Sequence, residues 1–351
     1  MRHKLSRISM VLSAGGVLTV GLASSAYAAT ASPQAPAAHA PAWHTILSAA
    51  NGRTPNQIDT VVATGKTSGW AFLSNSTAAY ERTGATTWKK VAFPGTGGAV
   101  TLGGASSPSN VWAAYRSGTV TQLDRWNGKK WALATTFTQG QIDAMSVLGP
   151  ADLWVFSASG GAYHYNGHRW TEVADTPYGG SALNDRNVWT ISGADVEHYN
   201  GSTWTTTNLA KLLPPSTGGP SYLTNILALG AGSVYATAEG GASQTNPRGG
   251  PGVLLHFNGH AWSRVAEDSS FANNPGETLA SDGKGGLWIA AEDFPGRVPG
   301  LLFHYSAGQL TQVNLGAASI SVSQIPGTAE ALSGGYQAGT GNGTSVVMQY
   351  S

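Results

Sequence analysis

The chain has 351 residues, 41% of them hydrophobic and 11% charged, and its formal charge at pH 7 is +1. Nucleic acid and anionic membrane surfaces are bound through an excess of lysine and arginine, so this near balance argues against both as main partners. The chain has no cysteine. Its stability must therefore come from a large hydrophobic core or a closed topology rather than from disulfide bonds.

The first 28 residues have the pattern of a secretory signal peptide. Three basic residues stand before residue 8, residues 8–22 form an apolar run, and the sequence A-Y-A at residues 26–28 is a cleavage signal. The run is too short for a comfortable membrane span, and no later run of about 20 apolar residues follows. We expect cleavage near Ala28, secretion of the mature chain, and no membrane insertion.

The segment after the expected cleavage site, residues 29–41, is rich in alanine and proline and shows no apolar period. Such a composition is typical of a disordered leader. Loss of the signal peptide would reduce the 19 basic residues to 16 and leave the 18 acidic ones, which changes the formal charge from +1 to −2. Residues 42–351 are then expected to form a single domain.

A repeated unit begins within this domain, and its clearest copy spans residues 152–173, DLWVFSASGGAYHYNGHRWTEV. LWVFSA, AYHY and RWTEV are rich in β-branched and aromatic residues and predict three strands. SGG predicts the first turn, and Asn166-Gly167 predicts a type I′ hairpin in which both turn residues take positive φ. Residues 143–149 precede the unit and predict one further strand.

Aromatic residues mark further copies along the chain at intervals of roughly 35 to 55 residues, a period typical of propeller blades. No helix-period segment of useful length follows the signal peptide. The pattern therefore predicts an all-β protein built of four-stranded antiparallel blades. The aromatic residue of the second strand recurs as Trp70, Trp112, Trp154, Trp189, Tyr235 and Trp288. The tryptophan of the last strand recurs as Trp88, Trp131, Trp170, Trp204 and Trp262.

The two ends of the chain determine the number of blades. The last residues, SVVMQYS, match the third strand LLFHYS of the preceding copy, so the last blade lacks its outer strand. The sequence AWHTIL at residues 42–47 has the pattern of that strand, which would place Trp43 beside Tyr350. Closure of this kind removes open sheet edges. We predict a monomeric seven-bladed β-propeller whose last blade is completed by the N-terminal strand, with six or eight blades as alternatives.

The sequences HYNGHRW and HYNGSTW, at residues 164–170 and 198–204, resemble blades of secreted bacterial propellers of the kelch and galactose-oxidase-like kind. The stretch ASDGKGGLWIAAE at residues 280–292 looks more like a blade of virginiamycin B lyase-type propellers. These resemblances imply the fold and transfer no activity. Galactose oxidase needs a copper site with a cysteine-crosslinked tyrosine, which a chain without cysteine cannot form.

Four histidines occupy one repeated position, directly before the aromatic residue of the third strand: His164, His198, His256 and His304. One hypothesis is a metal site, and the other is a structural role between blades. Equivalent residues of packed sheets lie about 10 Å apart, whereas zinc ligands lie about 2 Å from the metal. We therefore favour the structural role, in which each imidazole between the sheets can donate to one backbone carbonyl and accept from another group, and predict no metal.

The topology divides the loops between two faces of the propeller. Loops from first to second and from third to fourth strands share one face and are uniformly short. Second-to-third loops and blade-to-blade connections share the other face, where binding groups on a rigid scaffold are expected. The longest of these segments are residues 209–222, 239–252, 267–277, 292–300 and 336–345. The candidate ligand-binding residues on this face are Gln244, Asn246, Arg248, Phe271, Asn273, Asn274, Glu292, Asp293, Phe294, Arg297, Tyr336, Gln337 and Asn342.

Two functions fit this arrangement. The first is a secreted binding module that recognises a glycan or a protein through the loop-rich face. The second is a hydrolase or lyase at the mouth of the central channel, in which a carboxylate pair such as Glu292 and Asp293, with Arg248 or Arg297, would perform acid–base chemistry. Adjacent side chains on an extended strand diverge, and the sequence carries no hydrolase, metalloprotease or nucleotide-binding motif. We favour the binding module over an enzyme and predict neither catalytic residues nor a cofactor.

Overall fold

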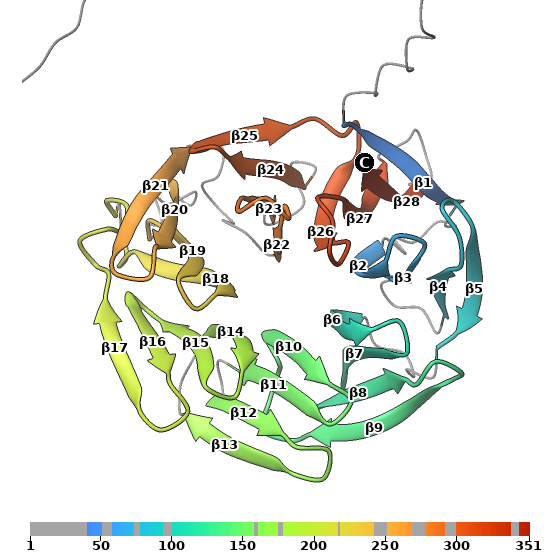
Figure 1. Ribbon diagram of the computed structural model, residues 1–351, viewed down its shortest axis with the longest axis horizontal. Helices are drawn as coiled ribbons and strands as arrows, with labels where there is room; N and C mark the ends of the chain where they lie inside the picture. Colours follow the sequence, from blue (N-terminus) through green and yellow to red (C-terminus); the bar gives the residue numbers. More distant parts are fainter. Residues whose placement is uncertain are drawn as a thin grey trace, which may run out of the picture. The chain divides into compact units, whose positions relative to one another are not determined.

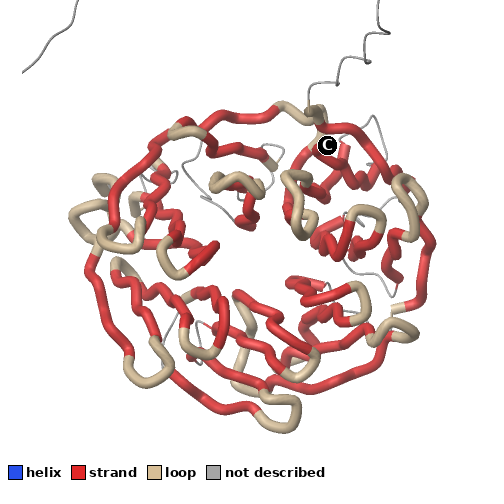
Figure 2. Tube along the Cα trace, in the orientation of Figure 1, coloured by secondary structure: helices blue, strands red, loops and turns tan. Residues whose placement is uncertain are grey.

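Seven four-stranded antiparallel sheets follow one another around a ring in residues 41–351 (Figure 1). The computed structural model describes residues 41–50, 58–73, 78–93, 100–157, 161–174, 178–216, 218–241, 251–268, 278–291, 300–337 and 344–351. The predicted signal peptide and most of the predicted leader lie outside these residues. The described segments consist of strands and the loops between them (Figure 2). Within them we find no helix of the length and apolarity needed to cross a membrane.

Each sheet is one blade, and we number the blades 1 to 7 in chain order. Blades 1 to 3 contain β2 (Ile58–Gly65), β3 (Ser68–Leu73), β4 (Ala78–Arg82) and β5 (Trp88–Ala92); β6 (Val100–Ser107), β7 (Asn110–Ser117), β8 (Val120–Trp126) and β9 (Trp131–Phe137); and β10 (Ala144–Gly149), β11 (Asp152–Ser157), β12 (Gly161–Tyr165) and β13 (Trp170–Ala174). Blades 4 and 5 contain β14 (Gly179–Asn184), β15 (Asn187–Ser192), β16 (Asp195–Tyr199) and β17 (Trp204–Asn208); and β18 (Tyr222–Gly230), β19 (Ser233–Glu239), β20 (Gly252–Phe257) and β21 (Trp262–Asp268). Blades 6 and 7 contain β22 (Thr278–Ser281), β23 (Leu287–Ala291), β24 (Leu301–Ser306) and β25 (Gln309–Val313); and β26 (Ala318–Gln324), β27 (Ala331–Gln337), β28 (Thr344–Tyr350) and β1 (Trp43–Ala50).

The ring closes through the N-terminal strand, as the sequence predicts. Strand β1 pairs antiparallel with β28 as the outer strand of blade 7, and Trp43 is the partner of Tyr350 in the register. The Trp43 ring also lies edge-on to Trp288 of blade 6, with centroids 5.1 Å apart. On the other side of blade 7, Arg82 of blade 1 donates a hydrogen bond to Gln349 at 2.5 Å. Both predictions, seven blades and closure by β1, are confirmed.

The repeated tryptophans form the packing between blades. The second-strand residues Trp70 and Trp189 are only 2% and 4% exposed. An outer-strand tryptophan of the following blade lies edge-on to each of them: Trp131 to Trp70 at 5.0 Å, and Trp262 to Trp189 at 6.2 Å. Edge-to-face aromatic pairs are favourable beyond the area that they bury. The core of the protein is therefore a series of aromatic layers between sheets.

Serine residues hold neighbouring blades together near the axis. Ser146, Ser181 and Ser323 occupy equivalent positions in the first strands of their blades. Each pairs with a second-strand residue, and that residue pairs on its other side with the repeated histidine of the third strand or with the residue in its place. Their hydroxyl oxygens accept backbone N–H groups from the first strands of the following blades at 3.0 to 3.1 Å. These bonds fix the rotation of one blade against the next, because a backbone N–H has a defined direction.

The Asn-Gly turns differ from the predicted two-residue type I′ hairpin. The loop between β12 and β13 has four residues, 166–169, and of these only Gly167 has a positive φ, at 89°. Asn166 avoids that region because its side-chain oxygen accepts the N–H groups of His168 and Arg169, both at 3.1 Å. The same side-chain bonds recur at Asn127, Asn200 and Asn258.

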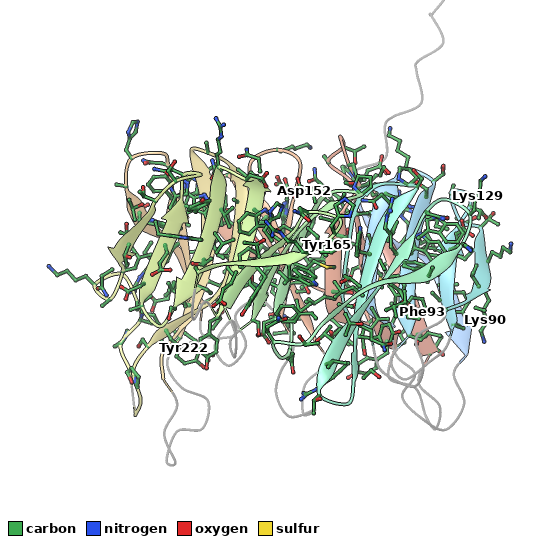
Figure 3. All side chains as sticks on the ribbon, turned by 90° about the horizontal axis from the view of Figure 1, so that it is seen from below. Lys90, Phe93, Lys129, Asp152, Tyr165 and Tyr222 are labelled. Atoms are coloured by element: carbon green, nitrogen blue, oxygen red, sulfur yellow. The ribbon has the colours of Figure 1, made fainter. Side chains whose placement is uncertain are left out.

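The strand order places the loops on two opposite faces. We call the face with the second-to-third loops and the blade-to-blade connections the loop face, and the face with the remaining hairpin turns the turn face. In the side view, Tyr222 lies at the loop face, whereas Lys129 and Asp152 lie at the turn face (Figure 3). This assignment of loops to faces is the one that the sequence predicts.

Candidate functional site

Two of the thirteen sequence-predicted binding residues lie among the described residues. Tyr336 and Gln337 end strand β27. The acid–base groups considered for a hydrolase or lyase are all among the rest, so that alternative stays a prediction. The eleven that lie outside the described residues are Gln244, Asn246, Arg248, Phe271, Asn273, Asn274, Glu292, Asp293, Phe294, Arg297 and Asn342.

Tyr336 lines a shallow cavity of about 540 Å³ between blades 6 and 7. Its other walls are Gly300, Leu301 and residues 312–318. Gln337 is exposed, and its amide donates a hydrogen bond to the carbonyl of Gly316 at 3.4 Å. The described part of this cavity has no charged side chain, so it offers a small polar and apolar surface rather than a charged one.

A second cavity of about 480 Å³ lies on the loop face where the central channel opens, and we call it the mouth cavity. It is formed by the starts of the first strands of blades 3 to 5, by β6, and by the end of β19. Tyr336 and Gln337, the two described candidates, are not among its described lining residues. Its lining residues are Thr101, Leu102, Gln141, Ile142, Asp143, Ala144, Tyr178, Gly179, Tyr222, Leu223, Thr224, Asn225 and Glu239.

Two exposed tyrosines border the mouth cavity. Tyr178 is 63% exposed and Tyr222 is 38% exposed. In the described part of the chain, Leu133 on the outer strand β9 is the one other large hydrophobic residue with comparable exposure, at 53%. Isolated exposed hydrophobic residues are ordinary, but aromatic residues that gather at one concave site indicate a binding surface.

Polar side chains complete the rim of the mouth cavity. Tyr222 and Glu239 are partners in the β18–β19 register, and the Tyr222 hydroxyl donates a hydrogen bond to Glu239. Burial raises the pKa of Glu239 above its usual value. Gln141 connects two charges, because its oxygen accepts from Arg116 at 3.2 Å and its nitrogen donates to Asp143 at 3.3 Å. The rim therefore holds carboxylates beside tyrosines, with the nearby arginine paired to a neutral amide.

The connection before β18 supports this rim. Leu209 and Leu213 of the connection are buried. Arg264 on the outer strand β21 donates hydrogen bonds to the carbonyls of Leu212 and Leu213, each at 2.8 Å. The connection is therefore fixed against blade 5. Tyr222 is held in place because it lies between this connection and the rest of strand β18.

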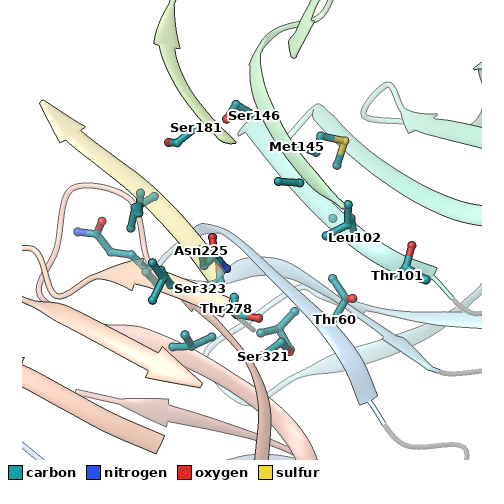
Figure 4. Close-up of a pocket in the computed structure, with 18 of the residues that line it drawn as sticks. Thr60, Thr101, Leu102, Met145, Ser146, Ser181, Asn225, Thr278, Ser321 and Ser323 are labelled. Atoms are coloured by element: carbon teal, nitrogen blue, oxygen red, sulfur yellow. The ribbon is translucent and has the colours of Figure 1, made fainter. Parts of the chain in front are cut away.

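The mouth cavity leads into the central channel, which encloses about 580 Å³. The first strands of all seven blades line the channel, and its surface is rich in hydroxyl and amide groups such as Thr60, Ser321 and Asn225 (Figure 4). Asp59 and Asp143 are the charged residues in this lining, and the described residues that line it include no lysine, arginine or histidine.

The repeated histidines lie away from both cavities, inside the blades. Each one stacks on the aromatic residue of the second strand with which it pairs in the register. The ring centroids are 4.8 Å apart for His164 and Trp154, 4.1 Å for His198 and Trp189, 4.2 Å for His256 and Tyr235, and 3.9 Å for His304 and Trp288. This parallel stacking supports the structural role that we favoured from the sequence.

The surroundings of Nε2 in these histidines correct the sequence prediction, which expected a backbone carbonyl as one partner. Nε2 of His164 lies 2.8 Å from Asp152 and 3.5 Å from Asp185, and Nε2 of His304 lies 3.1 Å from Asp282. Nε2 of His256 lies 3.2 Å from the Ser233 hydroxyl, and the buried Nε2 of His198 has no hydrogen-bond partner among the described residues. Asp152, His164 and Asp185 offer three potential metal ligands within 4.8 Å. In blade 6 the equivalent histidine contacts a single aspartate. Because the contact recurs there with one carboxylate instead of two, we interpret it as a structural hydrogen bond rather than as part of a metal site.

The residues of the mouth cavity were missed by the sequence analysis, although signals for three of them exist. Tyr222 and Glu239 stand at the ends of two long loop-face segments, 209–222 and 239–252, and the interior of the second supplied three of the candidates. Tyr178 stands in the connection DTPYGG, where an aromatic residue serves no expected strand position. Asp143 was assigned to a strand, whereas β10 begins at Ala144.

Comparison with known proteins supports the fold. The sequence matches no protein-family model and no curated protein. Solved structures of similar fold include YCF48 bound to D1 peptide, with TM-score 0.57, 12% identity, and coverage of 88% of this chain and 96% of that one. They also include the extracellular domain of BT4673 from B. thetaiotaomicron, with TM-score 0.58, 12% identity, and coverage of 85% and 39%.

A third similar structure is a catalytically inactive virginiamycin B lyase from Staphylococcus aureus with quinupristin, with TM-score 0.57, 9% identity, and coverage of 87% of this chain and 99% of that one. Identities this low show a shared propeller fold and nothing of function. The kelch-like and galactose-oxidase-like identity, the bacterial origin and secretion therefore stay predictions from the sequence.

Proposed function

We propose that this chain is a binding module that takes up a segment of a partner protein in the mouth cavity of the loop face. One observation carries the proposal: two of the three exposed large hydrophobic side chains among the described residues, Tyr178 and Tyr222, border the same cavity. Tyrosine provides a large contact area with little loss of side-chain entropy, and it is enriched where proteins bind one another.

Two further points support a protein segment as the ligand. The cavity stands on the ends of paired strands, so its shape is set before a ligand arrives and little ordering is needed on binding. Among the structures of similar fold, one is described as bound to a peptide. A glycan is the other ligand class that the sequence suggests, and the experiment below distinguishes the two.

The test begins with a phage-displayed library of random peptides selected on the wild-type propeller, alongside a glycan array. The affinity of each selected peptide is then measured for the wild type and for Tyr178→Ser and Leu133→Ser. Leu133 is the matched control, because it is similarly exposed and lies on an outer strand. We expect Tyr178→Ser to weaken peptide binding about tenfold or more, as for an interface hot spot, and Leu133→Ser to leave it unchanged.

Three outcomes would contradict the proposal. The first is a selection that yields no peptide above background. The second is a set of selected peptides that bind Tyr178→Ser as tightly as the wild type. The third is glycan binding that depends on Tyr178, which would replace the protein ligand with a carbohydrate.

A further inference from the structure

Charged residues are distributed unevenly around the ring. Residues 58–139, which form blades 1 and 2, contain eight lysine and arginine residues and three acidic ones. Residues 140–351 contain seven basic and 15 acidic residues. The near balance of charge over the whole chain therefore conceals a positive region in blades 1 and 2.

The exposed charges of blades 1 and 2 are all positive in the part of the chain that the structure describes. Asp59 and Glu81 are partly buried, and Asp124 is fully buried. Glu81 pairs with Lys89 in the register of β4 and β5, so one lysine has an acidic neighbour. None of the ion pairs between described residues involves an exposed basic residue of these blades. These basic residues are Lys66, Lys89, Lys90, Arg116, Lys129 and Lys130.

Four of the exposed lysines gather on the outer wall of the ring, where blade 1 meets blade 2. One pair lies on the outer strand β5, and the other lies in the turn between β8 and β9. Val91 and Trp131, which directly follow the two pairs, belong to one hydrophobic cluster between the blades. In the side view, Lys90 and Lys129 lie on the same side of the ring (Figure 3). We call the four residues the lysine patch: Lys89, Lys90, Lys129 and Lys130.

The backbone under the lysine patch is held in place. The side-chain oxygen of Asn127 accepts the N–H groups of Lys129 and Lys130, both at 3.0 Å, and the Asn127 N–H donates to the carbonyl of Lys130 at 3.3 Å. Lys89 and Lys90 are adjacent on a strand, so their side chains point to opposite faces of the sheet. Because both are exposed, this pair covers the outer edge of blade 1.

We infer that the lysine patch is a second binding site, which holds an acidic polysaccharide, a chain of sugars that carry carboxylate or sulfate groups. A lysine ammonium is a point charge on a flexible stem, so it neutralises closely spaced anions without requiring one fixed geometry. Release of the counterions of the polymer supplies much of the affinity. The described lining of the mouth cavity comes from β6 and from blades 3 to 5, so a polysaccharide and a protein segment can be bound together.

The composition of the lysine patch favours a polysaccharide over other anionic macromolecules. The cores of protein interfaces are enriched in tyrosine, tryptophan and arginine and depleted in lysine. Proteins that bind single-stranded nucleic acid present aromatic rings on which the bases stack. Among the described residues of blades 1 and 2, Leu133 is the one large hydrophobic side chain that is exposed. The patch therefore presents charge without an aromatic platform or an apolar interface core.

The test titrates a heparin oligosaccharide of defined length, as the acidic polysaccharide, against the wild type and three double variants between about 50 and 200 mM salt. Exposed lysines contribute little to stability, so all variants are expected to fold. The two control lysines are also exposed and lie in the connection before β18 and in the turn between β22 and β23. The variants, each with two positive charges removed, are Lys89→Gln with Lys90→Gln, Lys129→Gln with Lys130→Gln and, as the control, Lys211→Gln with Lys284→Gln.

We expect each variant of the lysine patch to bind heparin about tenfold or more weakly than the wild type. The slope of log affinity against log salt concentration should also decrease by about one to two, because each neutralised contact contributes about one. The control variant and Tyr178→Ser should bind heparin nearly as tightly as the wild type. Single-stranded DNA and poly-glutamate with the same number of charges should bind more weakly than heparin.

Four results would overturn the inference. The wild type does not bind heparin, or the control variant loses as much affinity as the variants of the patch, which would mean that only net charge matters. Heparin binding decreases in Tyr178→Ser, which would place the polysaccharide in the mouth cavity. DNA or poly-glutamate binds as tightly as heparin through the same lysines, which would make the partner a nucleic acid or an acidic protein. Peptide binding is measured without heparin, so the proposed function and this inference are tested separately.

Discussion

The turn face and the loop face of this propeller are built by different means. On the turn face, four loops repeat one arrangement, in which an asparagine side chain accepts two backbone N–H groups and the next residue, Gly128, Gly167, Gly201 or Gly259, has a φ between 88° and 95°. On the loop face, connections range from two-residue turns to segments such as residues 209–222. The repeat therefore specifies the sequence and conformation of the turn face, whereas the loops of the loop face can vary in length and sequence.

This separation has a physical basis in the blade. The turn-face loops close hairpins within one sheet, and their geometry follows from local hydrogen bonds. The loop face carries every connection between blades, and insertions there disturb no strand pairing. Stability should therefore depend on the repeat, and recognition of a protein segment on the loop face.

Removal of the closing strand should have the largest effect, because it opens the ring itself. A chain that starts at Ser48 lacks Trp43 and the buried Ile46, and exposes the edge of β28. We expect a loss on the order of 3 kcal/mol or more in the free energy of unfolding, the scale of losing a packed aromatic side chain.

Chemical denaturation followed by tryptophan fluorescence measures this loss. A chain that starts at Pro41 is the control, since it keeps all of β1, and it should match the full-length protein. Equal unfolding free energies for the chains starting at Pro41 and Ser48 would mean that the closure contributes nothing.

The same comparison explains how far the sequence could predict the structure. Blade number, strand order and closure were predictable, because tryptophans such as Trp154 and Trp189 recur at fixed places in a local pattern. The conformation of Asn166 was predicted wrongly, since the Asn-Gly pair also fits a four-residue loop that the asparagine side chain stabilises.

The mouth cavity could not be predicted in the same way. Gln141, Tyr178 and Tyr222 belong to three different blades, and no period in the sequence relates them. Their proximity depends on how blades 3 to 5 are rotated about the axis, and that rotation follows from packing and from bonds such as the one between Ser181 and Ala228.

Replacement of a repeated histidine should have the next largest effect and should leave the loop face intact. His198 stacks on Trp189 with centroids 4.1 Å apart. We expect His198→Ala to lower the free energy of unfolding by about 2 kcal/mol, because a void forms beside a buried ring. His198→Gln should cost less, and peptide binding should be unchanged in both. Addition of EDTA should leave the wild-type melting curve unmoved, whereas a decrease reversed by zinc would reveal a structural metal.

The pH dependence of the free energy of unfolding, compared between the wild type and His198→Gln, gives a second test of the histidine. Burial lowers the pKa of His198 below its usual value near 6.5. Above that value the histidine is neutral in both states, and as the pH falls below it the unfolded chain takes up a proton first, so the folded state loses stability. His198→Gln should therefore lose less stability than the wild type between about pH 6.5 and pH 5. Parallel pH profiles would contradict this.

Asp124 is a buried residue that departs from the repeat, and its replacement should raise the free energy of unfolding by a smaller amount. Asp124 is fully buried in β8 at the position that Tyr163 takes in blade 3, and its carboxylate oxygens have no hydrogen-bond partner among the described residues. Burial raises its pKa to about 6. The folded state therefore favours the protonated acid, and the penalty for ionisation grows as the pH rises from about 4 to 6.

Asp124→Asn should remove this penalty. We expect a gain of about 1–2 kcal/mol in the free energy of unfolding at pH 8. The gain should be small at pH 4, where the acid is neutral in the folded state and only about half ionised in the unfolded chain. Denaturation at the two pH values measures the difference. A gain of the same size at both pH values would mean that the packing around Asp124, rather than its charge, limits stability between these blades.

The smallest expected effect is a difference in stability between two glycine variants, one from each face. Gly167 on the turn face and Gly118 on the loop face both have positive φ, at 89° and 65°. An alanine at either position is strained by the positive φ, by roughly 1–2 kcal/mol. The strain is larger at Gly167, because a φ of 89° lies beyond the left-handed region in which the φ of Gly118 falls. At Gly167 the new Cβ would also lie 2.6 Å from the Cβ of Ala151, whereas at Gly118 no atom lies within 4 Å. Gly167→Ala should therefore be less stable than Gly118→Ala by about 1 kcal/mol, the cost of overpacking. Thermal unfolding of the two variants measures this difference. Equal melting temperatures would show that the turn face tolerates an added methyl group as readily as the loop face does.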